Sequence, residues 1–428
     1  MSTDPRLYDD LVARGLIQDS TDAQALKARL AEGPVKVYYG VDPTAPSIHV
    51  GNLIGLLVLR RFQDAGHHPL PLAGGATGMI GDPSGKSSER NLLDDEALAQ
   101  NLAGIVPLLR RFLDFEAEKN PARLFDNRAW TVSMSILDFL RDVGKHATIN
   151  QMVAKESVRN RMASEDGISY TEFSYMLLQA HDFLWLYQNE GCEMQIGGSD
   201  QWGNISLGVD LVRRVTGSKA YALTWPLLLK RDGTKYGKTA GGETMWLSAD
   251  MLSPYRFYQG WIQVEDAELR KLLLQLTLMS VEEVENVVAE HEADPGRRLG
   301  QQRLAREITA MVHGEEPKDA AVQASAVIFG ASGNDLTPET LEMLADEIPT
   351  TTVSRTSLDT EGNLVPLLVE AGVAKSNSEA MRLLKQNGVA VNDVKVASDK
   401  VVGRADLLHD QFCLLRKGKK SVHLVKYR

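Results

Sequence analysis

The chain has 428 residues, a mass of 47.1 kDa, a formal net charge of −10, 43% hydrophobic residues and 24% charged residues. This length suits about two to four domains, and the ordinary globular composition excludes wholesale disorder. Cys192 and Cys413 cannot by themselves form a disulfide framework or a four-ligand zinc site. The acidic, polar N-terminus is unlike a signal peptide, and no apolar stretch approaches the ~20 residues of a membrane span. We therefore expect a cytoplasmic protein with no membrane partner.

The charge is unevenly distributed along the chain. Residues 364–428 contain 12 Lys and Arg against 6 Asp and Glu, whereas residues 1–363 contain 35 against 51. A basic C-terminal segment on an acidic body indicates an appendage that binds a polyanion such as nucleic acid. The alternative is a solvated surface with a chance imbalance of charge.

The N-terminal half alternates short apolar runs with longer helical patterns. Short apolar runs predict strands at 35–41, 69–73 and 194–196. Helical patterns occupy residues 50–65, 171–190 and a stretch from about residue 200. This alternation predicts an α/β domain with a mostly parallel sheet covered by helices, and ligands bind such sheets beyond the carboxyl ends of the strands.

The C-terminal half has a different pattern. Residues 253–329 are helical throughout, whereas the stretch that follows is rich in Ser, Thr, Gly and Pro and predicts a linker. The basic tail predicts a small α+β unit, with short helices at 367–371 and 379–386 and a hairpin that turns at Asn392-Asp393. The expected segments are therefore 1–225, 226–252, 253–329, 330–362 and 363–428.

Residues 42–52, Asp-Pro-Thr-Ala-Pro-Ser-Ile-His-Val-Gly-Asn, join the first predicted strand to its helix. Ser47 or His49 can lie near the helix start, where free N–H groups and the helix dipole make an anion site. Gly51 leaves space where a flat ring can lie on the backbone. Thr44 and His49 can donate hydrogen bonds to a developing phosphate charge, although a single loop histidine is more often structural or merely exposed.

Residues 74–87, Gly-Gly-Ala-Thr-Gly-Met-Ile-Gly-Asp-Pro-Ser-Gly-Lys-Ser, resemble a phosphate-binding P-loop at first sight. The spacing fails, because Ile80 occupies the position of the first glycine. We therefore reject a Walker motif and keep a loop that contacts phosphate or substrate. Asp82, among small residues, can bind an ammonium group; the alternative is a helix-capping role.

The helix at 171–190 carries a narrow polar stripe. Tyr175, Gln179 and Asp182 follow i, i+4, i+7 spacing, and the rest of the circumference is mostly apolar. Because the apolar faces predict a buried helix, the stripe must face a partner or a polar cavity. The alternative is a stripe exposed to solvent, which would more usually contain Lys and Glu.

Two further loops contain residues suited to a nucleotide. In residues 195–204, Gln-Ile-Gly-Gly-Ser-Asp-Gln-Trp-Gly-Asn, a strand ends, Ser199 or Asp200 caps the next helix, and Asp200 is well placed for a ribose diol. In residues 230–239, Lys-Arg-Asp-Gly-Thr-Lys-Tyr-Gly-Lys-Thr, the side chains of Lys235, Lys238 and Thr239 can clamp a leaving pyrophosphate. Taken alone, such a loop is more often simply exposed.

Together these strings resemble bacterial tyrosyl-tRNA synthetases, a class I aminoacyl-tRNA synthetase family, along nearly the whole chain. His49-Val-Gly-Asn52 is similar to the class signature His-Ile-Gly-His, and Lys235-Tyr-Gly-Lys-Thr239 to Lys-Met-Ser-Lys-Ser. The string at 197–204 is the most specific, because it separates the tyrosine enzymes from the tryptophan enzymes. Asn52 departs from the signature's second histidine, and since Asn still donates a hydrogen bond, we expect an altered ribose or phosphate contact with activity retained.

The resemblance implies a Rossmann-like catalytic domain, an all-helical anticodon-binding domain and a small S4-like RNA-binding domain at 363–428. It implies that tyrosine reacts with ATP and Mg²⁺ to give tyrosyl-adenylate, and that the tyrosyl group then passes to the 3′ end of tRNA-Tyr. No tightly bound cofactor or resident metal is expected. Residues 145–158 resemble part of the family's dimer-forming insertion, so the resemblance also implies a homodimer.

The resemblance also implies roles for individual residues. Tyr38 and Asp182 would bind the substrate phenol. The ammonium group would contact Asp82, Tyr175 and Gln179, and the carboxyl end Gln195 and Gln201. The adenylate site would contain Gly40, Asp42, Gly51, Asn52, Gly198 and Asp200. The phosphates would contact Thr44, His49, Lys235, Lys238 and Thr239.

Three rival interpretations stay open at this point. A tryptophan-specific synthetase shares the fold, but the pair Tyr38 and Asp182, the string at 197–204 and the basic tail oppose it. A P-loop kinase is opposed by the glycine spacing of residues 74–87. A non-enzymatic RNA-binding protein would leave both phosphate signatures without a role.

Overall fold

A computed structural model describes residues 3–84, 93–163, 167–231, 233–234, 236–238, 242–333, 335–418 and 421–428. The chain forms two compact units. The first contains Met1–Leu252 and Gln263–Leu304, and the second contains Ser253–Ile262 and Ala305–Arg428. Among the described residues, no helix combines the length and the apolarity that crossing a membrane requires.

The first unit is built on a sheet with the strand order β1-β6-β5-β2-β3-β4. All neighbouring strands are parallel except β1, which runs antiparallel to β6. The strands are β1 (Asp19–Ser20), β2 (Lys36–Val41), β3 (His68–Ala73), β4 (Phe125–Asp126), β5 (Cys192–Gly198) and β6 (Tyr221–Trp225). The central strand β2 has β3 on one side and β5 on the other, so the chain order reverses at β2 and opens a crevice beyond the strand ends. The predicted α/β class and parallel sheet are confirmed.

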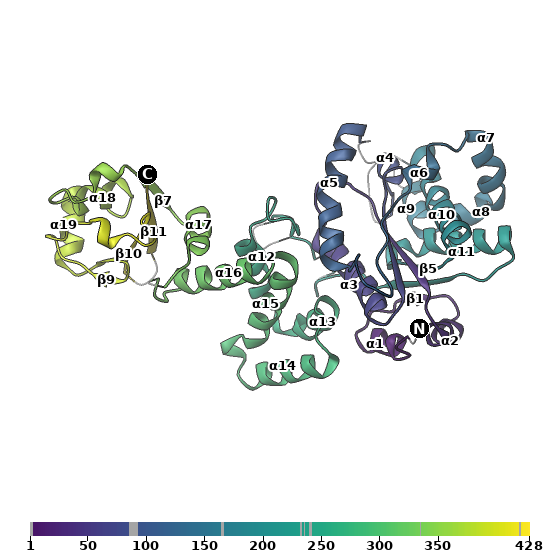
Figure 1. The fold of residues 1–428 in the computed structure, drawn as a ribbon, viewed down its shortest axis with the longest axis horizontal. Coiled ribbons are helices and arrows are strands. Elements are labelled where there is room, and N and C mark those ends of the chain that lie inside the picture. Colours follow the sequence, from purple (N-terminus) through teal and green to yellow (C-terminus); the bar gives the residue numbers. More distant parts are fainter. Residues whose placement is uncertain are drawn as a thin grey trace. The chain divides into compact units, whose positions relative to one another are not determined.

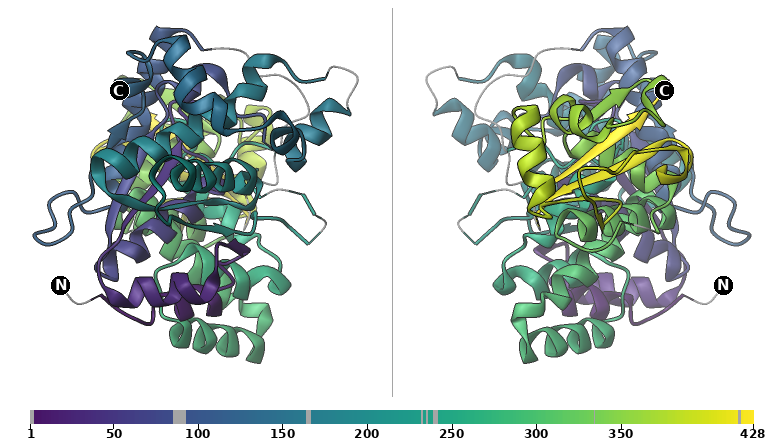
Figure 2. Two further views of the ribbon diagram at one scale, coloured as in Figure 1. Left: turned by 90° about the vertical axis from the view of Figure 1, so that its right-hand side faces the viewer. Right: turned by 90° about the vertical axis from the view of Figure 1, so that its left-hand side faces the viewer.

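Helices cover both faces of this sheet (Figures 1 and 2). On one face α3 packs on β2 and β3, whereas α10 and α11 pack on β5 from the other. The bounds are α1 (Leu7–Ala13), α2 (Ala23–Glu32), α3 (Val50–Asp64), α4 (Thr77–Ile80), α5 (Asp95–Phe112), α10 (Tyr170–Glu190) and α11 (Trp202–Thr216). The strands and helices expected in this half occur within a few residues of their predicted positions.

The alternation of side chains along β2 explains this layering. Neighbouring residues of a strand point to opposite faces. Tyr38 therefore packs on Phe183 of α10, with ring centroids 5.6 Å apart, and Tyr39 packs on Trp225 of β6 at 5.4 Å. Both tyrosines are buried, so the strand needs an apolar cover on each face.

An insertion of short helices follows β4 (Figure 1). Its elements are α6 (Arg128–Thr131), α7 (Ile136–Asp138), the π-helix η1 (Phe139–Val143), the 3₁₀ helix η2 (Gly144–His146), α8 (Ile149–Val153) and α9 (Glu156–Met162). A buried ion pair fastens α9 to α10, because Arg161 Nη2 lies 2.8 Å from Glu172 Oε2. The two side chains are only 4% and 1% exposed. A second bond from Arg161 Nη2 to the carbonyl of Gly167 closes the connection between the helices.

Residues 253–329 are helical, as expected from the sequence. The helices are α12 (Pro254–Ile262), α13 (Asp266–Leu276), α14 (Val281–Ala293), the 3₁₀ helix η4 (Pro295–Arg297), α15 (Leu299–His313) and α16 (Glu315–Ile328). They do not form one separate unit, because α13 and α14 group with the first unit and α12 and α16 with the second. The reason is packing that helical periodicity does not encode: α13 contacts α3, and α12 contacts α16.

The prediction that residues 330–362 form a linker is wrong. This segment contains α17 (Pro338–Glu347), β7 (Thr350–Val353) and the 3₁₀ turn η5 (Arg355–Ser357). Thr337 caps α17, with its side chain accepting from the amide of Thr340, and Pro338 takes the first helical position. These elements are short, so their periodicity was too weak to stand out from the surrounding polar residues.

The C-terminal sheet has the order β7-β11-β10-β8-β9, and β7 pairs parallel with β11. Its other strands are β8 (Val389–Val391), β9 (Val394–Lys395), β10 (Phe412–Lys417) and β11 (Ser421–Tyr427). The helices α18 (Leu364–Glu370) and α19 (Asn377–Lys385) lie close to their predicted positions. The hairpin is confirmed: Asn392 and Asp393 have φ values of 46° and 61°, as a tight turn of this kind requires.

We predict that the buried ion pair is a major support of the first unit. Arg161→Ala leaves the Glu172 carboxylate buried without its partner, and such changes cost about 3–5 kcal/mol of unfolding free energy. The double variant Arg161→Met, Glu172→Leu should recover most of that loss, because it removes both charges. Urea unfolding followed by tryptophan fluorescence measures both.

The matched control is Arg123→Ala. Arg123 pairs with Glu190, but its side chain is 52% exposed, so the expected loss is about 1 kcal/mol or less. Similar losses for Arg161→Ala and Arg123→Ala would contradict the assignment.

Candidate active site

A polar cavity of about 300 Å³ opens at the carboxyl ends of β2 and β5, where the strand order reverses. Lys235 and Thr239 lie outside the described residues. Lys238 is described but does not line the cavity. The other residues predicted for the site all do: Tyr38, Gly40, Asp42, Thr44, His49, Gly51, Asn52, Asp82, Tyr175, Gln179, Asp182, Gln195, Gly198, Asp200 and Gln201.

Asp182 lies on the buried part of the cavity wall, and two neutral donors hold its carboxylate. Oδ1 accepts from Trp130 Nε1 at 2.8 Å, and Oδ2 accepts from Asn127 Nδ2 at 2.9 Å. The indole of Trp130 is in turn stacked on Trp185, with centroids 4.1 Å apart. No cation compensates the carboxylate among these partners, so its charge depends on hydrogen bonds alone.

Burial changes the ionisation of this wall. It raises the pKa of Asp182 to about 7, although the bonds from Asn127 and Trp130 act in the opposite direction. Burial and the nearby Asp182 carboxylate raise the pKa of the Tyr38 phenol well above its ordinary value. Tyr38 is therefore a neutral hydroxyl at neutral pH, and among the described residues its oxygen is buried without a hydrogen-bond partner.

A second carboxylate, Asp42, connects three elements at the end of β2. Its Oδ2 accepts from the Tyr175 hydroxyl at 2.7 Å, and its Oδ1 accepts from Thr77 Oγ1 at 2.7 Å. Asn127 also donates to Thr77, at 3.0 Å, so the Asp42 and Asp182 groups belong to one network. Gly74 permits this arrangement, because a Cβ there would lie 2.1 Å from Asp42 Oδ1.

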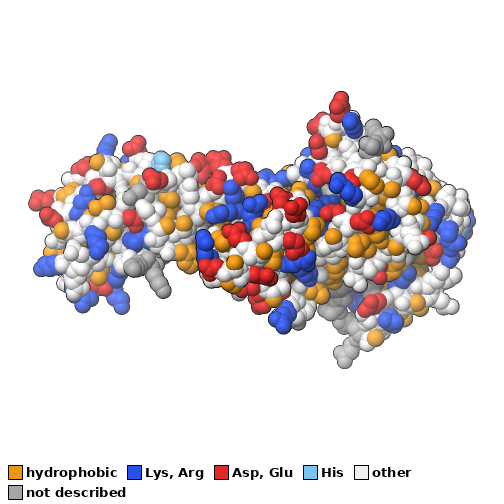
Figure 3. Space-filling view, turned by 90° about the horizontal axis from the view of Figure 1, so that it is seen from below, with side chains coloured by type: hydrophobic (Ala, Val, Ile, Leu, Met, Phe, Trp, Pro, Cys, Tyr) orange, Lys and Arg blue, Asp and Glu red, His pale blue; other side chains and the backbone are white. Residues whose placement is uncertain are grey.

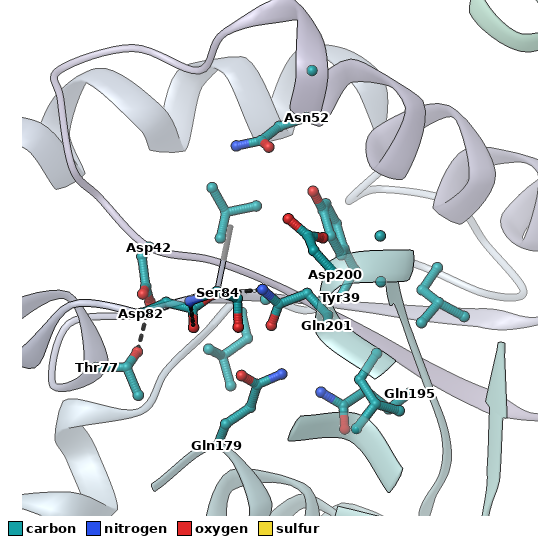
Figure 4. Close-up of a pocket in the computed structure, with 18 of the residues that line it drawn as sticks. Tyr39, Asp42, Asn52, Thr77, Asp82, Ser84, Gln179, Gln195, Asp200 and Gln201 are labelled. Atoms are coloured by element: carbon teal, nitrogen blue, oxygen red, sulfur yellow. Dashed lines mark hydrogen bonds between the residues drawn. The ribbon is translucent and has the colours of Figure 1, made fainter. Parts of the chain in front are cut away.

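A third carboxylate, Asp82, also lines the cavity, beside Asp42, and Gln201 points toward it (Figure 4). It accepts from Gln201 Nε2 at 2.5 Å and from the backbone amide of Ser84 at 3.0 Å. Asn204 Nδ2 lies 3.0 Å from Gln179 Oε1 and 3.2 Å from Gln201 Oε1. The side chains of Asp82 and Gln179 thus belong to one hydrogen-bond network, and both line the cavity.

His49 is the N-cap of α3, one of the two residues that the sequence placed near this helix start. Its Nδ1 accepts from the amide of Gly51 at 3.0 Å, so the neutral ring carries its proton on Nε2 and can donate there. A Cβ on Gly51 would lie 2.7 Å from His49 Cε1, so the missing side chain leaves room for this histidine. Gly51 also lines the cavity, and the expectation that a flat ligand ring lies on its backbone stays a prediction.

The capping expected at 199–200 is also wrong. Ser199–Gln201 form a short 3₁₀ turn, η3, and neither Ser199 nor Asp200 caps α11, which begins at Trp202 without a side-chain cap. Asp200 instead lines the cavity next to Gly198. The turn moves the helix start two residues along, a detail that the local sequence does not reveal.

Thr77, Asn127, Trp130 and Asn204 belong to the site and were not selected from the sequence. Thr77 and Asn204 lie inside strings already singled out there, so their polar character was the available signal. Asn127 and Trp130 follow β4, a strand of two residues with no recognisable period. Only the tertiary contact with Asp182 identifies them.

Family models and curated relatives that match this chain all belong to one family of proteins. Residues 30–330 match the family described as tRNA synthetases class I (W and Y), and residues 340–425 match the tyrosine–tRNA ligase SYY-like C-terminal domain. A tyrosine–tRNA ligase of Opitutus terrae is 51% identical over 98% of this chain and 99% of its own length. Another, of Roseiflexus castenholzii, is 48% identical over 98% and 99%.

A solved structure agrees with these relatives. The C-terminally truncated mitochondrial tyrosyl-tRNA synthetase of Aspergillus nidulans is 31% identical, with a TM-score of 0.69 over 76% of this chain and 94% of that one. The family match covers more than half of the chain, and the similarity to the curated relatives extends over nearly all of it. The chain therefore belongs to the tyrosine–tRNA ligase family of class I aminoacyl-tRNA synthetases.

Proposed function

We propose that this protein activates L-tyrosine with ATP and transfers it to tRNA-Tyr. In the first step the tyrosine carboxylate attacks the α-phosphorus of ATP, which enters with Mg²⁺ as substrate. A bond forms from the carboxylate oxygen to the α-phosphorus, the bond between that phosphorus and the bridging oxygen breaks, and pyrophosphate leaves. In the second step a hydroxyl of the terminal adenosine attacks the tyrosyl carbonyl and releases AMP. The substrates supply the nucleophiles, so the protein contributes position and charge stabilisation.

The observation that carries this proposal is the pair formed by Tyr38 and Asp182. A phenol both donates and accepts one hydrogen bond readily. The Asp182 carboxylate offers an acceptor and the neutral Tyr38 hydroxyl offers a donor on the same buried wall. Phenylalanine would leave the Tyr38 hydroxyl without a partner and Asp182 with only its bonds from Asn127 and Trp130, which is costly in a buried site.

The amino end of the substrate finds matching oxygens. An ammonium group has three donors. Asp82 offers a carboxylate, Gln179 an amide oxygen, and Tyr175 the free lone pairs of a hydroxyl whose proton already points to Asp42. Gln195 and Gln201 would then lie around the carboxyl end of tyrosine. This arrangement supports the roles that the family resemblance implies.

We assign the nucleotide to the other end of the cavity. Gly40, Asp42, Gly51, Asn52, Gly198 and Asp200 would line the adenylate, and the phosphates would contact Thr44, His49, Lys235, Lys238 and Thr239. The Nε2 proton of His49, at the start of α3, supports a phosphate contact. Asp200, beside the glycine turn, suits a ribose diol.

The deciding experiment is ATP–pyrophosphate exchange with the purified protein and each of the twenty amino acids in turn. Exchange with tyrosine alone supports both the adenylation step and the pocket assignment. Exchange with tryptophan would keep the fold and overturn the pocket. The absence of exchange from folded protein would overturn the proposed reaction.

We further propose that the second unit and the helices of 253–329 bind tRNA, the helices at the anticodon and the S4-like part at the RNA backbone. The excess of Lys and Arg in residues 364–428 supports the backbone contact. On the face drawn in Figure 3, basic side chains of this part are spread out with acidic ones between them, so several weak contacts with RNA fit better than one basic patch.

We propose that the protein is cytoplasmic, because its two cysteines are buried and unpaired, as is usual in a reducing compartment.

We propose a homodimer through the insertion that follows β4. Large apolar side chains are exposed there, including Val132, Ile136, Leu137 and Ile149 at 68%, 74%, 73% and 62%. The short helices that carry most of them lie together on one side of the first unit (Figure 1). Neighbouring exposed apolar side chains of this size are typical of a protein interface.

We predict different kinetic defects at the two ends of the cavity. Asp182→Ala should mainly raise the KM for tyrosine, because the phenol loses its acceptor. His49→Ala should mainly lower kcat for exchange, because the phosphate loses a donor in the transition state, a loss of about 100-fold. Equal losses of tyrosine affinity in both variants would contradict these roles.

We predict that tyrosine binding weakens as the pH falls through about 7, the pKa of Asp182, because protonation turns the carboxylate into a neutral acid, which is a weaker acceptor for the phenol. Trp130→Phe removes a bond that lowers this pKa, so the pKa rises further. Calorimetric titration should show that Trp130→Phe binds tyrosine more weakly than the unaltered protein at pH 7. The difference in affinity should be smaller at pH 8.5. A deficit that is equal at both pH values would indicate a steric defect instead.

We predict that the double variant Ile136→Asp, Leu137→Asp is monomeric at concentrations where the unaltered protein is dimeric, because charge in a buried interface is costly. Sedimentation velocity measures this directly. Phe329→Asp is the matched control, because Phe329 is 77% exposed and belongs to the second unit instead of the insertion. Dissociation by the control alone, or by neither variant, would place the interface elsewhere.

A further inference from the structure

One wall of the cavity is hydrogen-bonded to α13 through the side chains of Glu268 and Lys271. The wall consists of the described residues of the segment 227–236, of which Leu227, Leu228 and Tyr236 line the cavity. Glu268, in the first turn of α13, accepts from the backbone amide of Arg231 at 2.6 Å through Oε1. Its other oxygen, Oε2, accepts from the Tyr236 hydroxyl. One side chain thus holds both a backbone group and a ring of the same wall.

Backbone hydrogen bonds join the described residues of this wall to one another, so the bonds from Glu268 to Arg231 and Tyr236 are enough to place them. The amide of Tyr236 donates to the carbonyl of Leu228 at 2.8 Å, and the amide of Lys230 donates to the carbonyl of Thr234 at 2.7 Å. Lys271, one helical turn after Glu268, donates to the carbonyl of Leu229 at 3.3 Å. The same face of α13 therefore contacts the wall at three positions.

The C-terminal end of α13 is also fixed by hydrogen bonds. Arg14 donates to the carbonyls of Leu274 and Met279, at 3.2 and 2.8 Å, and Arg61 donates to the carbonyl of Thr277. Both arginine side chains are buried. Arg61 belongs to α3, the helix that His49 caps, so α13 is fixed to the same helix whose start lies at the cavity. Glu268 is thus presented from a rigid support.

The wall lies at the nucleotide end of the cavity. A Cβ on Gly198 would lie 3.5 Å from Leu227 Cδ2 and 2.7 Å from Asp200 Oδ1, so the start of the segment lies beside the proposed ribose site. The donors to Asp182 come instead from Asn127 and Trp130. A disturbance of the wall should therefore affect the nucleotide more than the phenol.

We propose that Glu268 is a positioning residue for the adenylation step. It acts through the Arg231 amide and the Tyr236 hydroxyl to hold this wall, the described residues of 227–236, against the nucleotide, and it touches no substrate itself. The inference rests on the proposed function, because the step it serves is tyrosine activation. A small displacement of a positioned group is enough to slow such a step strongly.

The test is a double-mutant cycle on tyrosine-dependent ATP–pyrophosphate exchange. Glu268→Ala removes both attachments, Tyr236→Phe removes only the hydroxyl bond, and Glu268→Gln keeps the shape and one acceptor. We expect Glu268→Ala to lower kcat/KM for ATP by about tenfold or more, with the KM for tyrosine nearly unchanged. Glu268→Gln and Tyr236→Phe should have intermediate effects, and the double variant Glu268→Ala, Tyr236→Phe should be no worse than Glu268→Ala alone.

Glu285→Ala is the matched control. Glu285 pairs with Arg270 of α13, and both side chains are exposed. Among the described residues, neither forms a hydrogen bond or ion pair with the wall. The control should exchange at the rate of the unaltered protein. Thermal unfolding of every variant separates loss of position from loss of fold, and Tyr236→Phe keeps the cycle informative if Glu268→Ala unfolds.

Three outcomes would overturn the inference. These are an unchanged rate in Glu268→Ala, an equal rise in the KM values for ATP and tyrosine, or additive losses in the double variant. Absence of tyrosine-dependent exchange in the unaltered protein is a different result, because it would overturn the proposed function and not this positioning role.

Discussion

Four carboxylates, Asp42, Asp82, Asp182 and Asp200, line one cavity, and hydrogen bonds from several elements of the first unit hold Asp42, Asp82 and Asp182. A buried carboxylate without partners is expensive, so each oxygen of Asp42 and Asp182 receives a donor. The donors come from α4, α10 and the segment after β4, elements far apart in the chain. The network therefore joins these elements at the strand ends and defines the shape of the cavity before any substrate enters.

The same constraint gives the polar groups of the site fixed donor and acceptor roles. Asp182 is held only by neutral donors, so burial brings its pKa to about 7, and its charge responds to whatever group faces it. The Tyr175 hydroxyl donates its proton to Asp42, so toward a ligand the Tyr175 oxygen can act only as an acceptor. Groups with fixed donor and acceptor roles discriminate between ligands because a mismatch leaves a buried polar atom unpaired.

The helical region shows how a catalytic unit gains support from outside its sheet. Arg14 and Arg61 hold the end of α13 through backbone carbonyls, and Glu268 at its start reaches the cavity wall. These contacts place α13 and α14 with the sheet, although the chain leaves that unit and returns to it. A domain boundary drawn along the sequence thus divides residues that work together.

The sequence by itself determined the α/β class, the parallel sheet, the family and most of the residues that line the cavity, because these depend on period, spacing and short motifs. It also located the Asn392-Asp393 turn. Only the tertiary structure decided that residues 330–362 contain α17 and β7, that η3 shifts the start of α11, that Asn127 and Trp130 donate to Asp182, and that Glu268 accepts from Arg231 and Tyr236. Short elements carry little periodic signal, and a partner that is distant along the chain becomes visible only when folding brings the two groups together.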